Sequence, residues 1–76
     1  MASQEAIARA QAIKAKYERE LMRKRNVVGV GIGRSQGKTV IRVYVAKDTP
    51  RVRKAVPEIL DDVPVEIVVS GPFQAL

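Results

Sequence analysis

The chain has 76 residues, of which 46% are hydrophobic, and it carries a formal net charge of +6 at pH 7. It contains no cysteine and no histidine, which excludes disulfides, thiolate metal sites, cysteine nucleophiles and acid–base mechanisms that need an imidazole. A chain of this length forms one small domain that buries only about 60% of its unfolded surface. No apolar run approaches the roughly 20 residues that span a bilayer, and the start of the chain has no secretion-signal pattern. We therefore expect a cytoplasmic protein that is not an enzyme and uses no cofactor or metal.

The first 25 residues are predicted to form one long N-terminal helix. No glycine or proline interrupts this stretch, and apolar side chains recur on one stripe at helical spacing: Ala6, Ala10, Ile13, Tyr17 and Leu21. A helix over residues 4–25 spans about 33 Å, against about 26 Å for a strand of eight residues. We therefore expect its first turns to overhang the domain, where Ala6 and Ala10 could contact a partner.

Residues 26–33 alternate a branched aliphatic residue with glycine in the order N-V-V-G-V-G-I-G. This pattern predicts a strand with one aliphatic face and one face of almost bare backbone, formed by Gly29, Gly31 and Gly33. Glycine inside a strand costs about 0.5–1 kcal/mol relative to alanine. We therefore expect a helix, a loop or another chain to lie close against the glycine face.

Residues 26–76 are predicted to hold a β-hairpin, a short broken helix, a third strand and a short tail. The hairpin has a loop at residues 34–37 and a second strand at residues 38–45, which buries the face that holds Ile41 and Val43. A short helix at residues 50–55 begins with Thr49 as its cap and Pro50 in its first position. Further elements follow in this order: a helical turn at 57–60, a strand at 63–70 and a tail from 73.

The predicted order is α-β-β-α-β, which defines an α+β fold. A tight hairpin pairs the first two strands antiparallel, and a right-handed helical crossover places the third strand parallel to the second. The prediction is a three-stranded sheet with both helices on one face, which is a ferredoxin-like sandwich that lacks its first strand. A sheet of this kind has an open edge at which another strand can pair.

Three segments carry a resemblance to a known family: residues 26–33, the strand around Tyr44, and Val56 and Pro57 followed by V-P-V-E at residues 63–66. They resemble, over about residues 26–73, a small module found N-terminal to trypsin-like serine peptidases and also as short stand-alone bacterial proteins. The topology is similar to the propeptide folding domains of secreted serine proteases. The resemblance implies an accessory, chaperone-like or assembly module and no catalytic role, because the peptidase residues are absent.

Several motifs have a structural and a functional reading. The glycines of residues 29–33 do not have dinucleotide-loop spacing and are not followed by a helix, and residues 33–37 differ from the nucleic-acid-binding G-x-x-G loop by one residue. Glu58, Asp61 and Asp62 form either a cation site or solvated surface. We expect Tyr17 to pack in the core. Tyr44 lies on the outer face of its strand, where it either packs on the protein surface or stacks on a nucleic-acid base.

The positive charge leaves two main functions open. We predict a non-enzymatic protein-interaction or self-assembly module, with a homo-oligomer or another protein as partner, no membrane contact, and an interface formed by Gly29, Gly31, Gly33, Ala6, Ala10, Tyr44 and Phe73. One alternative is a small basic protein that binds nucleic acid or a ribonucleoprotein through Arg9, Lys16, Arg19, Arg23, Arg51, Arg53 and Lys54. The resemblance adds a third possible function, that of a peptidase-associated folding aid or inhibitor.

Overall fold

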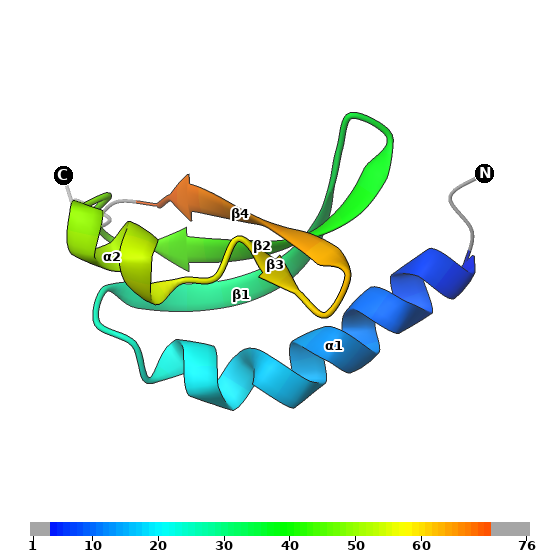
Figure 1. Cartoon of the computed structure of the whole chain (residues 1–76), viewed down its shortest axis with the longest axis horizontal. Coiled ribbons are helices and arrows are strands. Elements are labelled where there is room, and N and C mark those ends of the chain that lie inside the picture. Colours follow the sequence, from blue (N-terminus) through cyan, green and yellow to red (C-terminus); the bar gives the residue numbers. More distant parts are fainter. Residues whose placement is uncertain (1–3, 71–76) are drawn as a thin grey trace, which may run out of the picture.

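A computed structural model of the chain describes residues 4–70 and shows an α+β fold. Figure 1 shows a long helix packed beneath a twisted sheet, with a second short helix at one side. The elements in chain order are α1 (Gln4–Met22), β1 (Val27–Ser35), β2 (Lys38–Val45), α2 (Pro50–Ala55), β3 (Ile59–Leu60) and β4 (Val63–Val69).

The sheet has four strands in the order β1-β2-β4-β3, so the prediction of three strands was wrong. The hairpin strands β1 and β2 are antiparallel and β2 and β4 are parallel, as predicted. The additional strand β3 pairs antiparallel with the start of β4, with Leu60 opposite Val63. It replaces the helical turn expected at residues 57–60, because Leu60 is buried in the core and Asp61, at φ 56°, reverses the chain directly into β4.

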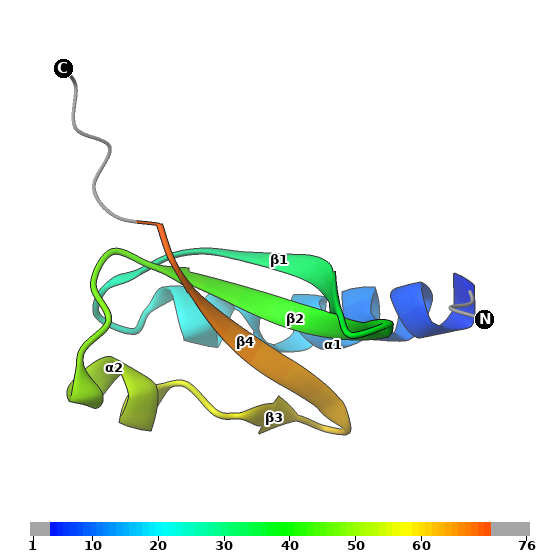
Figure 2. The same cartoon turned by 90° about the horizontal axis from the view of Figure 1, so that it is seen from above.

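The two helices cover different strands of the sheet and contribute to the same core. Helix α1 packs beneath β1 and β2, whereas α2 lies beside the sheet on the β4 side when the molecule is seen from above (Figure 2). The core lies between the sheet and the helices, and β2 supplies its fully buried centre with Ile41, Val43 and Val45. Further core residues come from every other element: Ile13, Leu21, Val27, Val52, Val56, Leu60 and Val63.

The glycine-rich strand contains a β-bulge that the alternating pattern does not reveal. Val27 is opposite Val45 and Gly29 is opposite Tyr44, which leaves Val28 as the extra residue. The bulge turns Val27 into the core and leaves the side chain of Val28 52% exposed. Before it, α1 ends at Met22, and Asn26 at φ 72° turns the chain into β1.

Residues at the hairpin turn and at the start of α2 determine the local backbone there. The hairpin turn comprises only Gln36 and Gly37, both at positive φ (52° and 78°), so the predicted loop was too long. Thr49 caps α2 as predicted, because its hydroxyl accepts a hydrogen bond of 3.1 Å from the backbone N–H of Val52. Pro50 occupies the start of the helix, where its missing N–H costs nothing.

Candidate interaction surface

The space above the glycines is occupied by side chains of the neighbouring strand β2. A Cβ atom at Gly31 would lie 3.3 Å from the ring of Tyr44, and one at Gly29 would lie 3.7 Å from the same ring. A Cβ at Gly33 would collide with the side chain of Arg42. The close approach predicted for the glycine face is therefore made by Tyr44 and Arg42, and no helix among residues 4–70 covers this face (Figure 2).

Arg42 holds a polar network on the same face. Its Nε donates to a carboxylate oxygen of Glu66 at 3.3 Å, and its NH2 group donates to the backbone carbonyl of Arg34 at 3.0 Å. The tip of the β1–β2 hairpin bends away from α1 (Figure 1) and brings Ser35 toward this network. The Ser35 hydroxyl, and then Arg42, lower the pKa of Glu66 below its ordinary value.

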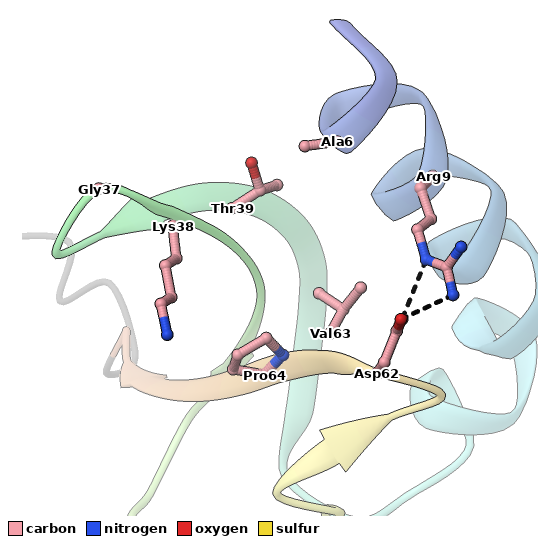
Figure 3. Close-up of a pocket in the computed structure, with 8 residues that line it drawn as sticks. All are labelled: Ala6, Arg9, Gly37, Lys38, Thr39, Asp62, Val63 and Pro64. Atoms are coloured by element: carbon pink, nitrogen blue, oxygen red, sulfur yellow. Dashed lines mark hydrogen bonds and ion pairs between the residues drawn. The ribbon is translucent and has the colours of Figure 1, made fainter. Parts of the chain in front are cut away.

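Three of the seven predicted nucleic-acid contacts form ion pairs within the fold. Arg9 binds both carboxylate oxygens of Asp62 at 2.9 and 2.8 Å (Figure 3). Arg53 likewise binds both oxygens of Asp48 at 2.7 Å, and these hydrogen bonds lower the pKa of Asp48. Lys16 lies 3.6 Å from Asp61. Within residues 4–70, no ion pair is found for the other four: Arg19, Arg23, Arg51 and Lys54.

The two aspartates of the β3–β4 turn connect this turn to α1. The Tyr17 hydroxyl donates to Asp61 at 3.0 Å, on the same carboxylate that Lys16 approaches, while Asp62 holds Arg9. Both carboxylates therefore contact α1 while their side chains stay 39% and 64% exposed, so they lie on the solvated surface as ion-pair partners. The sequence contains no signal for these contacts, because the partners are more than 40 positions apart.

Two hollows flank the N-terminal half of α1, where the bent hairpin separates from the helix. The one in Figure 3 has a volume of about 300 Å³ and lies between Ala6, the hairpin residues around Thr39, and the start of β4 at Pro64. The second, of about 400 Å³, lies on the β1 side and is lined by Ile7, Gln11, Ile32, Gly33, Arg34 and Thr39. Of the predicted contact residues, Ala6 lines a hollow, Ala10 is completely buried, and Phe73 lies outside the described residues.

The free edge of β1 is the longest unpaired strand edge in residues 4–70. The strand order leaves one side of β1 without a neighbour, whereas β3 pairs with the start of β4 at the opposite edge. Nine residues form β1, and none before Arg34 is charged or proline. The side chain of Ile7, which is 41% exposed, lies on this side of the molecule beside Ile32. Sequence analysis predicted an open edge but did not specify which strand would form it.

No helix within residues 4–70 is long and apolar enough to cross a membrane. Comparison of the chain with protein-family models, with curated proteins and with solved structures finds no match. The inferred function therefore rests on the geometry of the chain itself.

Proposed function

We propose that this protein is a non-enzymatic interaction module that binds an extended segment of a partner protein along the free edge of β1. The observation that carries the proposal is the combination of length and chemistry at this edge. Proteins protect edge strands with charges, prolines, bulges or covering elements. From Gly29 to Gly33 this strand has none of these protections, and its bulge lies before that stretch at Val28.

The backbone groups available at the edge follow from the hairpin geometry. In a two-residue hairpin the residues that flank the turn form a hydrogen-bonded pair, and such pairs alternate along an antiparallel ladder. Counting from the Ser35 and Lys38 pair, the glycines direct their N–H and C=O groups toward β2. Val30 and Ile32 therefore direct theirs toward the free edge, where a strand added by a partner would bind them.

The edge can be tested with a fluorescent peptide of alternating valine and threonine, whose binding is measured by anisotropy and by amide shifts of the labelled protein. We expect saturable binding and shifts concentrated in β1. Val30→Pro removes an edge donor without removing a β1–β2 hydrogen bond, and Val30→Ala is the matched control for the lost side chain. The proline variant should no longer bind the peptide, and the alanine variant should still bind it.

Two results would contradict the proposal. One is equal peptide binding by the proline and alanine variants, and the other is an absence of amide shifts in β1 of the wild-type protein at saturating peptide. The second measurement uses the unaltered chain, so it remains decisive if the proline variant does not fold. Shifts confined to Arg19, Arg23 and Lys54 on addition of RNA would favour the nucleic-acid alternative.

A further inference from the structure

We propose that the strand recruited at β1 is β1 of a second copy of this chain, paired antiparallel about a two-fold axis that passes between the two copies of Gly31. This inference rests on the proposed function, because it uses the same edge, and it adds the partner and the register. Gly29 would then lie opposite Gly33 of the partner subunit, and Val30 opposite the partner's Ile32. The two sheets would join into one continuous sheet.

The register follows from what limits the regular part of β1. The bulge at Val28 interrupts the strand on one side, and the only charge of the strand, Arg34, interrupts it on the other. The uncharged, regular stretch between them is Gly29 to Gly33, and its centre is Gly31. Antiparallel pairing about this centre keeps glycine opposite glycine and aliphatic opposite aliphatic, so both copies place α1 on the same side of the joined sheet.

The pairing also suits the residues next to the edge. Because Arg9 and Lys16 of α1 reach the β3–β4 turn, the opposite flank of the helix faces the β1 side, and its side chains recur at helical spacing: Ile7, Gln11, Lys14 and Glu18. Lys14 and Glu18 form an ion pair of 3.1 Å, so this flank has no net charge to repel its copy. Ile7 is 41% exposed and would be covered.

Strand spacing places the two helices at packing distance. Each α1 lies beneath β1 and β2, and strands lie about 4.8 Å apart. If each helix axis follows the boundary between β1 and β2, joining the β1 edges sets the two axes about 10 Å apart, which is within the range of packed helices. The dimer would therefore bury apolar flanks in addition to forming backbone hydrogen bonds.

Single cysteines give a direct test, because the chain has no cysteine of its own. Gly31→Cys places a thiol next to the proposed axis, directly opposite its copy, where a disulfide can form under mild oxidation. Val28→Cys is the matched control, because Val28 is exposed but would lie roughly 20 Å from its copy in this register. We expect rapid cross-linking of the first variant only. Equal cross-linking rates for the two variants would overturn the register.

A charge series tests the same register without disturbing the core. Val28 and Arg34 of the partner subunit would both lie at the end of the paired stretch and close to each other, so Val28→Lys should raise the dimer dissociation constant measured by sedimentation, and Val28→Glu should lower it. Two such pairs per dimer predict changes of about 2- to 30-fold. Adding Arg34→Glu to the Val28→Lys variant should return its dissociation constant to near the wild-type value. Equal effects of lysine and glutamate would contradict the pairing.

The two proposals fail in different ways. If the chain stays monomeric at every concentration and its Gly31→Cys variant does not cross-link, but β1 still binds the valine–threonine peptide, the second copy is wrong and the edge function remains. If the peptide also leaves β1 unaffected, the edge function is wrong as well. A dimer whose Val30 and Ile32 amides exchange as fast as those of the monomer would refute the edge pairing alone.

Discussion

The Tyr44 ring crowds the position of a side chain at Gly31 and lies within ordinary contact distance of one at Gly29, which accounts for glycine at Gly31 in a strand. An aromatic ring laid over cross-strand glycine covers backbone that would otherwise be exposed. Gly33 makes the same kind of room for Arg42, which then reaches both Glu66 and the Arg34 carbonyl. The glycines thus make room for side chains of β2 within the fold. The other edge of the same strand stays unpaired.

We predict that Gly31→Val destabilises the protein by about 1–2 kcal/mol, because its side chain must displace the Tyr44 ring. In a Tyr44→Thr background the same substitution should be neutral or stabilising, since valine favours strands and the obstructing ring is gone. Urea denaturation of the four proteins at low concentration gives the coupling energy. A coupling energy near zero would show that Tyr44 does not fill this space.

Glu66 should make stability depend on acid pH. Its folded pKa lies below the ordinary value of 4.5, so its contribution is complete above that value and is lost as the pH falls through the lower, folded pKa. We predict that Glu66→Gln is less stable than the wild type at neutral pH and that the difference narrows in acid. Denaturant melts at several pH values test this, and a difference that widens in acid would contradict it.

At the scale of elements, the short helix α2 depends on its cap. It has six residues and its first turn contains no acidic residue, so the Thr49 hydroxyl is the only side-chain acceptor at its N-terminus among the described residues. Thr49→Ala should cost about 1 kcal/mol of unfolding free energy. Thr49→Ser keeps the hydroxyl and should cost much less. Equal losses from alanine and serine would assign the effect to the threonine methyl group instead.

The sequence predicts elements where its signals are local and misses features set by distant contacts. Strand β2 and the start of α2 follow from the pattern of residues 38–45 and from Thr49 and Pro50. Strand β3 was missed because two residues are too short to show a period, and pairing with β4 decides their conformation. The bulge at Val28 and the Tyr17 contact with Asp61 depend on partners far along the chain. The glycine pattern indicated close contact but could not identify Tyr44 as its source.

At the scale of the whole molecule, part of the positive charge is paired with carboxylates of the same chain. Exposed ion pairs connect Asp61 and Asp62 of the β3–β4 turn to α1, and a local pair connects Asp48 to Arg53 of α2. The cations of residues 4–70 that form no ion pair are distributed over both helices, the hairpin and the loops: Arg19, Arg23, Lys24, Arg25, Arg34, Lys38, Lys47, Arg51 and Lys54. Strand β1 carries no charge before Arg34. Binding driven by charge and binding through the β1 edge should therefore be separable by substitution.

Two triple variants that remove the same charge test this separation. Arg19, Arg23 and Lys54 have no ion pair among residues 4–70, whereas Arg9, Lys16 and Arg53 do; each set is replaced by glutamine. We expect wild-type affinity for random RNA to be weak, with a Kd on the order of 10⁻⁴–10⁻⁶ M at physiological salt. Both triple variants should weaken RNA binding similarly and flatten its salt dependence, because non-specific binding follows total charge.

Self-association should persist in the first triple variant, since edge pairing does not use those side chains. Submicromolar, sequence-dependent RNA binding that only the first triple abolishes would instead assign those three residues to a nucleic-acid site.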